Sequence, residues 1–440
     1  MAKTEAPNSI PVNLQKLPGL VCISHIFEVP LDYSNPGGEK LSIFAREVRS
    51  KENAHRSDLP WLLFLQGGPG FQSPRPESND GWLKRALTDY RVLLLDQRGT
   101  GLSAPVTAQT LSEFENAHVQ FEYLKHFRAD NIVRDAEFIR ERIAAGQRWT
   151  LLGQSYGGFC ATTYLSHSPA GLQSVVITGG LPPLVDSPDE VYRATYRQLA
   201  AKNKLFYERY PEDRVKVSKI VEHLRENKTL LPTGEVLTPR RFLQLGLLFG
   251  FNLSGHSMNT IHYLLEEAFV SSRKGSGKQL SQTFLTQVER MSGFGTNPIY
   301  ALLHESIYCQ GKASLWSASK VLDEFDEFKS NNDVQFFTGE MIYPWLFDDY
   351  AQLKPLKEVA ESLANFESWP RLYDRDVLCQ NSVPVAAAIY YNDMYVDKVF
   401  SEQTAEAIRG CKVWITNEYE HDGLRQDGER ILDRLLDMLS

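Results

Sequence analysis

The chain has 440 residues, of which 42% are hydrophobic and 23% are charged, and these fractions are those of an ordinary globular protein. Its formal net charge of −8 excludes a general basic surface, so neither nucleic acid nor an anionic membrane is an expected partner. The length is too great for one simple core and fits one large α/β domain with a substantial insertion, or two domains.

Targeting and metal-binding signals are weak along the whole chain. The N-terminus holds no apolar core of a signal peptide, and no run of about 18 apolar residues predicts a membrane span. The five cysteines are widely spaced and form neither a Cys-x-x-Cys pair nor a Cys/His metal pattern. We therefore expect reduced, mostly buried thiols in a cytoplasmic protein without a metal site.

The N-terminal part alternates between strand and helix signals. A turn is expected at residues 35–38 (Asn-Pro-Gly-Gly), and residues 131–143 carry apolar side chains on one helical face. Six apolar or alternating runs predict strands at residues 25–30, 41–48, 61–65, 91–95, 149–152 and 175–178. This alternation implies a mostly parallel sheet with right-handed crossovers.

A Gly-x-Ser-x-Gly pentapeptide at residues 153–157 follows the last but one of these strands and precedes a helix-like stretch at 159–165. A serine at a sharp strand-to-helix turn has its hydroxyl raised above the sheet, and the next backbone N–H can face an oxyanion. The small flanking residues let strand and helix approach closely. Ser155 is therefore the candidate nucleophile, with Tyr156 as an oxyanion donor. The alternative is a glycine-rich turn with an ordinary serine.

The pattern changes after the Leu-Pro-Pro segment that ends at residue 183. The following stretch is long, aromatic and mostly helix-like, and strand signals return only near the C-terminal end. We expect an α/β fold in which residues 1–183 and 376–440 form a catalytic domain around a mostly parallel sheet. Residues 184–375 would then be a helical cap domain inserted late in that sheet.

A serine nucleophile needs a base, and the base needs an orienting carboxylate. In the α/β-hydrolase fold these residues follow in the order serine, acid, histidine, and the last two lie in loops after late strands. Expected strands at 383–391 and 412–416 are followed by Asp393 and His421. His421 is the only histidine after the cap. Asp393 is favoured as the acid because it lies closer to the strand end, and Asp397 remains the alternative.

A second oxyanion donor should come from the loop after an early strand. The segment Gln-Gly-Gly-Pro-Gly at residues 66–70 follows the expected strand at 61–65. Glycine lets a backbone amide approach a bound carbonyl oxygen, so Gly67 or Gly68 is the candidate donor. A plain tight turn is the alternative, and a phosphate-binding loop is disfavoured because no Gly-Lys-Ser/Thr follows.

These motifs together resemble the prolyl iminopeptidase (proline iminopeptidase) family of α/β-hydrolases, particularly its longer members. The matching segments are Gln-Gly-Gly-Pro-Gly at 66–70, Asp-Gln-Arg-Gly-Thr-Gly-Leu-Ser at 96–103, the helix at 130–137 and the serine motif at 153–158. The resemblance covers most of the expected catalytic domain and only short segments of the cap. One departure is Gln66, which stands where the family often has a titratable histidine.

The resemblance implies a serine aminopeptidase that releases an N-terminal residue, preferably proline, from small peptides with a free N-terminus and without a cofactor. It also implies that glutamates of the cap bind the substrate amine, and Glu305 and Glu340 lie in segments similar to those sites. A buried ammonium group needs such a partner. Tyr343 and Trp345 could form an apolar slot for a pyrrolidine ring, with packing of the cap as the alternative.

Other functions stay open at this point. Tripeptidyl aminopeptidase-like relatives share the Gly-Gly-Pro-Gly and Asp-Gln-Arg-Gly segments, and an esterase would need the same serine, histidine and acid. A non-catalytic binding protein on a hydrolase scaffold is a third possibility, which the complete set of candidate catalytic residues disfavours. Epoxide hydrolases and dehalogenases are disfavoured because they use an aspartate nucleophile.

Overall fold

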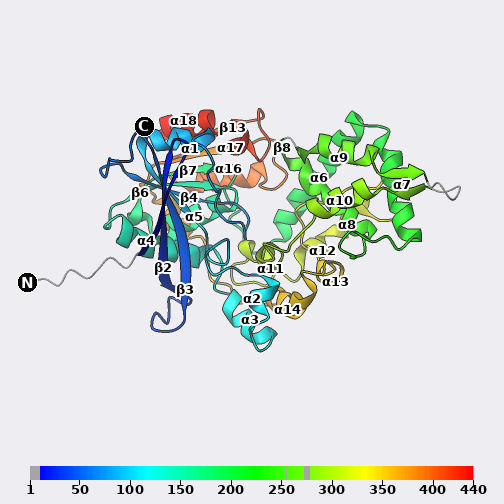
Figure 1. Cartoon of the computed structure of the whole chain (residues 1–440), viewed down its shortest axis with the longest axis horizontal. Coiled ribbons are helices and arrows are strands. Elements are labelled where there is room, and N and C mark those ends of the chain that lie inside the picture. Colours follow the sequence, from blue (N-terminus) through cyan, green and yellow to red (C-terminus); the bar gives the residue numbers. More distant parts are fainter. Residues whose placement is uncertain (1–9, 254, 272–277, 440) are drawn as a thin grey trace, which may run out of the picture.

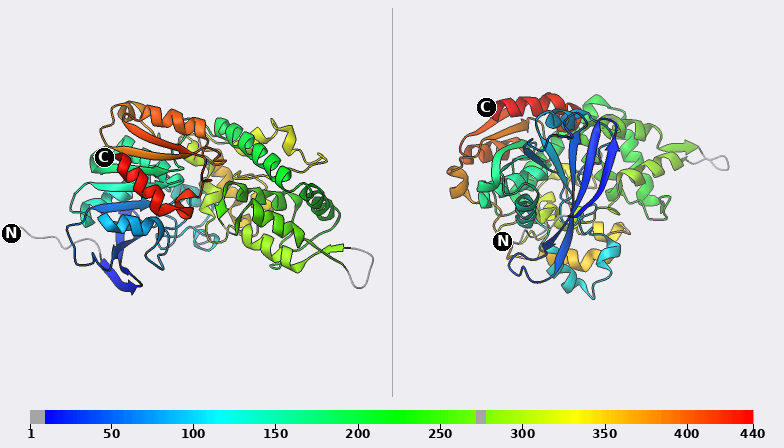
Figure 2. Two further views of the ribbon diagram at one scale, coloured as in Figure 1. Left: turned by 90° about the horizontal axis from the view of Figure 1, so that it is seen from above. Right: turned by 60° about the vertical axis from the view of Figure 1, so that its left-hand side comes forward.

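The computed structural model of the chain describes residues 10–253, 255–271 and 278–439. A sheet domain, which holds the first and last described residues of the chain, lies at one end of the molecule, and a cluster of helices from the middle of the sequence lies at the other (Figure 1). The same separation is visible when the molecule is seen from above (Figure 2). Within the described residues, no helix combines the length and apolar character that crossing a membrane requires.

A nine-stranded sheet forms the first region, in the order β1-β2-β3-β5-β4-β6-β7-β12-β13. Its strands are β1 (Ile10–Leu17), β2 (Leu20–Pro30), β3 (Lys40–Ser50), β4 (Trp61–Leu65), β5 (Arg91–Leu95), β6 (Trp149–Gln154), β7 (Leu172–Thr178), β12 (Val385–Tyr390) and β13 (Cys411–Thr416). The pairs from β1 to β5 are antiparallel, and the remaining pairs are parallel. The expected α/β-hydrolase fold with a mostly parallel sheet is confirmed.

The central strands β4 and β5 are short and, apart from Arg91 at the start of β5, apolar, because helices cover both faces of the sheet. Helices α1 (Gly81–Asp89) and α18 (Gly428–Leu439) pack on one face. Helices α4 (Ala129–Ile143), α5 (Tyr156–His167) and α16 (Lys398–Ala407) contribute to the core on the other. The strand β1 is not among the six predicted N-terminal strands. It pairs only with β2 at the sheet edge, and the prediction began at residue 25.

The chain between β7 and β12 is mostly helical, as the composition change after residue 183 predicts. Its helices are α6 (Asp189–Arg209), α7 (Asp213–Glu226), α8 (Pro239–Leu243), α9 (Met258–Glu266), α10 (Gln282–Met291), α11 (Ile299–Leu303), α12 (Ser317–Leu322), α13 (Leu346–Asp349), α14 (Lys357–Ala364) and α15 (Arg375–Cys379). Two small ribbons join them: β8 (Asn252–Leu253) with β9 (His256–Ser257), and β10 (Phe269–Ser271) with β11 (Lys278–Leu280). We call residues 184–375 the cap.

Two short helices of the sheet domain lie beneath the cap. They are α2 (Ala108–Leu111) and α3 (Ala117–Leu124), and α3 packs against α14 (Figure 1). Single 3₁₀ turns connect other elements, at Pro169–Gly171, Gln244–Gly250, Glu305–Tyr308, Asp326–Phe328 and Lys354–Leu356. The remaining short helix, α17 (Gly423–Gln426), follows the last strand and leads into α18.

Candidate active site

Ser155 lies at the turn between the end of β6 and the start of α5, as its motif predicts. Its backbone has a φ of 55°, a strained value for a residue with a side chain. The turn is tight because the helix passes directly over the preceding loop. A Cβ atom on Gly157 would collide with the carbonyl oxygen of Leu65, so no larger residue fits at that position. This crowding holds the Ser155 hydroxyl at the end of the sheet that faces the cap.

The side chains of Ser155, His421 and Asp393 form a hydrogen-bonded chain. His421 Nε2 lies 2.9 Å from Ser155 Oγ, and His421 Nδ1 lies 2.6 Å from Asp393 Oδ2. The other carboxylate oxygen of Asp393 accepts the backbone N–H groups of Tyr395 and Val396 at 2.8 and 3.1 Å. These bonds hold the carboxylate still while it orients the imidazole, so the geometry is that of a nucleophile, base and acid in series.

The alternative acid, Asp397, has a different position. Its Oδ1 accepts the backbone N–H groups of Val399 and Phe400 at 2.9 and 3.3 Å and thereby caps α16. No contact between Asp397 and His421 occurs within the described residues. The structure therefore favours Asp393 as the partner of the histidine.

His421 is buried, and burial disfavours its charged form. The negative charge of Asp393 and the hydrogen bond between the two side chains outweigh burial, so the pKa of His421 is raised above its usual value. An imidazole of raised pKa takes a proton more readily. This suits a base that must accept the proton of a serine hydroxyl.

The candidate oxyanion donors lie on either side of the serine. Gly67 is in close contact with it, since a Cβ on Gly67 would come within 2.9 Å of Ser155 Cβ. In the described part of the chain, no group accepts the N–H of Gly67 or Gly68. Tyr156 is the first residue of α5, so its N–H has no partner within the helix. The three predicted donors are thus gathered around Ser155, where a carbonyl oxygen of the substrate would lie.

The Asp-Gln-Arg-Gly segment at residues 96–99 supports the oxyanion loop. The side-chain amide of Gln97 donates to the carbonyl oxygen of Gln66 at 2.9 Å and so ties the oxyanion loop to the end of β5. Arg98 forms a fully buried ion pair with Asp135 of α4 at 2.6 Å. The segment that carried part of the family resemblance therefore has a structural role that positions the site.

Ser155 and His421 open onto a cavity of about 410 Å³ between the sheet domain and the cap. Its polar lining includes Gln66, Gln154, Gln244, Glu340 and Arg425. Its apolar wall includes Phe71, Leu247, Phe251, Phe294, Met341 and Ile342, of which all but Phe71 belong to the cap. A cavity of this size and composition fits a small organic ligand with a few polar groups.

Among the described residues of the cap, Glu340 is the one carboxylate that lines this cavity. Tyr300 donates its hydroxyl to Glu340 Oε1 at 2.7 Å. Burial raises the pKa of Glu340 to about 7, and the hydrogen bond from Tyr300 and the charge of His421 oppose that rise. No Lys or Arg side chain among the described residues pairs with it. A buried carboxylate without a cationic partner, beside a nucleophile, is suited to receive a substrate cation.

Glu305 does not line the cavity, in contrast to the expectation from the family resemblance. It is buried in the cap, and its Oε1 accepts the N–H of Ala318 at 2.9 Å in the first turn of α12. Burial raises the pKa of Glu305 to about 7. Its carboxylate is thus engaged at a helix N-terminus, where its charge is favoured by the helix dipole.

Tyr343 and Trp345 are also absent from the cavity lining. The Tyr343 hydroxyl shares a hydrogen bond of 2.8 Å with the hydroxyl of Tyr196, and its ring stacks on Trp345 at 5.4 Å between centroids. Trp345 also faces the guanidinium of Arg240 at 4.7 Å. The two rings therefore contribute to packing of the cap, which was the alternative that the sequence left open.

The structure adds site residues that the sequence did not indicate. Tyr300 orients Glu340, and the ring of Tyr395 packs against His421 with 4.8 Å between centroids. Phe71 also lines the cavity, and its position directly after the Gln-Gly-Gly-Pro-Gly motif could have indicated this from the sequence. No local sequence pattern distinguishes Tyr300 and Tyr395 from the many other aromatic residues of the chain.

The cap also contacts the loop that carries the histidine. Lys202 of α6 pairs with Glu420 through two contacts of 2.7 Å, and the Lys202 side chain is only 6% exposed. The backbone N–H of His421 donates to the carbonyl oxygen of Gly250 at 3.2 Å. The position of the base thus depends on the cap as well as on the sheet.

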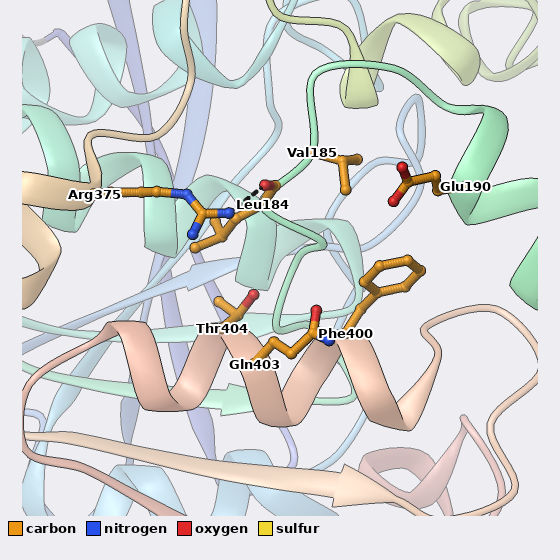
Figure 3. A pocket seen from close by; sticks show the side chains of 7 residues that line it. All are labelled: Leu184, Val185, Glu190, Arg375, Phe400, Gln403 and Thr404. Atoms are coloured by element: carbon orange, nitrogen blue, oxygen red, sulfur yellow. Dashed lines mark hydrogen bonds between the residues drawn. The ribbon is translucent and has the colours of Figure 1, made fainter.

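A second cavity of about 360 Å³ lies where the cap begins, between the segment 184–190 and α16. Figure 3 shows its lining, in which the Arg375 guanidinium donates to the carbonyl oxygen of Leu184. It holds Glu190 and Gln403 but none of the candidate catalytic residues. The chemistry of the candidate site is therefore confined to the first cavity.

The sheet topology and the serine turn define the chain as an α/β-hydrolase. A family model described as "alpha/beta hydrolase fold" matches residues 60–222, which begin just before β4 and end in α7. The chain is 48% identical to a proline iminopeptidase of Aeromonas sobria, over 96% of this chain and 97% of that protein. It is 38% identical to the proline iminopeptidase aneH of Aspergillus aculeatus, over 93% of this chain and 91% of the relative.

Identity of this extent over nearly the whole length of both chains means that the protein belongs to the proline iminopeptidase family of α/β-hydrolases. The match covers 96% of the chain and therefore includes the cap. The resemblance deduced from the short motifs is thus confirmed over the full chain.

Proposed function

We propose that the protein is a serine aminopeptidase that releases an N-terminal residue, preferably proline, from small peptides. The observation that carries the proposal is the buried Glu340 carboxylate in the same cavity as Ser155. An unblocked N-terminus provides the cation that this carboxylate lacks. The names of the two relatives, both proline iminopeptidases, support the preference for proline.

In this mechanism His421 Nε2 takes the proton of Ser155 Oγ as the serine attacks the first carbonyl carbon of the peptide. Asp393 holds the imidazole in the required tautomer and stabilises its charged form. The N–H groups of Tyr156 and of Gly67 or Gly68 bind the oxyanion of the tetrahedral intermediate, and each such donor contributes about 3 kcal/mol to lowering the barrier.

Collapse of the intermediate releases the rest of the peptide. His421 donates its proton to the leaving nitrogen, which leaves the N-terminal residue bound to Ser155 as an ester. Water then attacks this ester with His421 again as the base, and the free amino acid departs. Glu340 sets the distance between the amine and the serine, so only the first peptide bond reaches the nucleophile.

Small peptides with a free N-terminus are thus the proposed substrates, and no cofactor takes part in these steps. We further propose a cytoplasmic location, which the five free cysteine thiols support.

The test is hydrolysis of prolyl naphthylamide, its N-acetylated form and naphthyl acetate by the purified protein. The proposal requires hydrolysis of the prolyl amide, with a large loss when the amine is acetylated. Other aminoacyl naphthylamides then measure the preference for proline. Equal turnover of the free and the acetylated amide, or activity on the simple ester alone, would instead support the esterase alternative.

A further inference from the structure

One positive side chain lines the cavity that holds Ser155. Within the described residues, Arg425 is the only lysine or arginine in that lining. It belongs to α17, four positions after His421, and part of its side chain is exposed to solvent. The proposed reaction as described so far gives it no role.

The Arg425 guanidinium makes no hydrogen bond or ion pair in the part of the chain that the structure describes. The acidic group whose charge acts on Arg425 is Asp422, and its carboxylate is already engaged. Asp427, which is nearer in sequence, accepts the hydroxyl of Tyr419 at 2.7 Å. Asp422 Oδ2 accepts the N–H groups of Asn252 and Leu253 at 3.1 and 3.0 Å, and Oδ1 accepts the side-chain amide of Gln426. The cavity therefore offers a cation whose fork of N–H donors is free to receive an anion.

The position of Arg425 relates to the leaving group rather than to the N-terminal residue. His421 must deliver its proton to the leaving nitrogen, so the leaving group has to lie against the imidazole. The charge of Arg425 is close enough to that imidazole to oppose its protonation, although the influence of Asp393 is larger. A group attached to the leaving nitrogen thus lies within the field of Arg425.

We infer that Arg425 forms a subsite for a carboxylate on the leaving group, so that dipeptides with proline first and a free C-terminus are preferred substrates. This inference rests on the proposed aminopeptidase function. In such a dipeptide the carboxylate carbon is two bonds from the leaving nitrogen. Because the leaving nitrogen must face His421 to receive its proton, the carboxylate also lies near His421. The zwitterion then places its ammonium at Glu340 and its carboxylate at Arg425.

Arginine suits this role because its planar guanidinium binds a carboxylate through two parallel hydrogen bonds. The guanidinium is exposed, so salt screens the attraction and the preference should weaken as ionic strength rises. An acidic side chain on the second residue carries the same chemical group. The substrates tested must therefore separate a C-terminal carboxylate from a side-chain carboxylate.

The experiment compares kcat/KM for Pro-Gly with that for Pro-Gly amide, and for Pro-Glu amide with that for Pro-Gln amide, at low salt. The wild-type enzyme should favour Pro-Gly over Pro-Gly amide by about tenfold. In Arg425→Gln the ratio should fall to about one. Any change that the substitution makes to His421 affects both members of a pair and cancels in the ratio. Arg148→Gln, which removes an exposed charge away from the cavity, should keep the wild-type ratio.

A gain for Pro-Gly alone assigns Arg425 to the C-terminal carboxylate, and a gain for Pro-Glu amide shows that it also accepts an acidic side chain. A wild-type ratio near one for Pro-Gly against Pro-Gly amide would overturn the inference without any variant, even while prolyl naphthylamide is hydrolysed. A preference that survives in Arg425→Gln would overturn it as well. If no prolyl substrate is hydrolysed at all, it is the proposed function that fails.

Discussion

The sheet domain and the cap contribute to the same cavity by different means. In the sheet domain, Ser155, Asp393 and His421 each follow the end of a parallel strand, where hydrogen bonds between neighbouring strands determine the backbone position. In the cap, Glu340 lies outside any regular element, and its place depends on packing of the helices around it. The catalytic groups are therefore positioned by the ends of hydrogen-bonded strands, whereas the proposed substrate-binding carboxylate is positioned by side-chain packing within the cap.

This difference implies that substitutions of the catalytic residues in the sheet domain should abolish hydrolysis. Substitutions in the cap should instead alter substrate choice or the alignment of the base.

The largest expected effect is that of Ser155→Ala. It removes the nucleophile and should lower kcat for prolyl naphthylamide by at least about 10⁴-fold. Ser362→Ala, an exposed serine of α14, serves as the control and should retain wild-type activity. Retention of more than a hundredth of the activity in Ser155→Ala would exclude Ser155 as the nucleophile.

The next largest effect should distinguish two glutamates of the cap, Glu340 and Glu305. Glu340→Gln should reduce kcat/KM for prolyl naphthylamide by about 100-fold, because a charge-assisted contact with the amine is lost. Hydrolysis of naphthyl acetate should fall far less, since that substrate has no ammonium group. Equal losses on both substrates would contradict an amine-binding role.

Glu305→Gln is the matched control for that prediction, since Gln can still accept the N–H of Ala318. It should change kcat/KM by less than about threefold. Its effect should appear in stability. Because burial raises the pKa of Glu305 to about 7, the ionised form costs folding free energy as pH rises through that value. The variant should therefore lose less thermal stability than wild type between pH 5 and pH 8.

A third prediction tests whether the cap helps to hold the base. Lys202→Met leaves the Glu420 carboxylate, which is largely buried, without its cation and should cost about 3 kcal/mol of stability. The double variant Lys202→Met/Glu420→Gln should recover much of that loss in denaturant unfolding. The effects of the two substitutions on kcat should also be non-additive, because Glu420 directly precedes His421 in the chain. Additive effects on both quantities would mean that the ion pair acts independently of the active site.

The smallest expected effect concerns the pH dependence of kcat/KM. His421 must be neutral to act as base, and Glu340 must be ionised to bind the amine, so both requirements fail as pH falls. Both pKa values are raised, that of Glu340 to about 7, so the decline should begin near neutral pH. Two protonations should make the wild-type decline steeper than tenfold per pH unit. In Glu340→Gln the slope should return to about tenfold, and an unchanged slope would remove Glu340 from the titration.

The fold class and the order of the catalytic groups follow from the amino-acid sequence alone. Runs of four or five mostly apolar residues predict the buried central strands, and the serine motif joins one of them to a helix, because these patterns report on local geometry. His421 could be selected because one histidine follows the last strand. Asp393 and Asp397 could not be separated with certainty, since both follow β12 and only their hydrogen bonds distinguish a partner of histidine from a helix cap.

Which cap residues reach the cavity is visible only in the folded structure. Glu305, Glu340, Tyr343 and Trp345 have similar sequence surroundings, yet of these only Glu340 lines the cavity beside Ser155. Their positions depend on side-chain packing between helices that are distant in sequence, and no periodicity encodes such contacts. Arg425 illustrates the same limit, because its significance comes from the absence of an ion-pair partner in the described structure rather than from any motif.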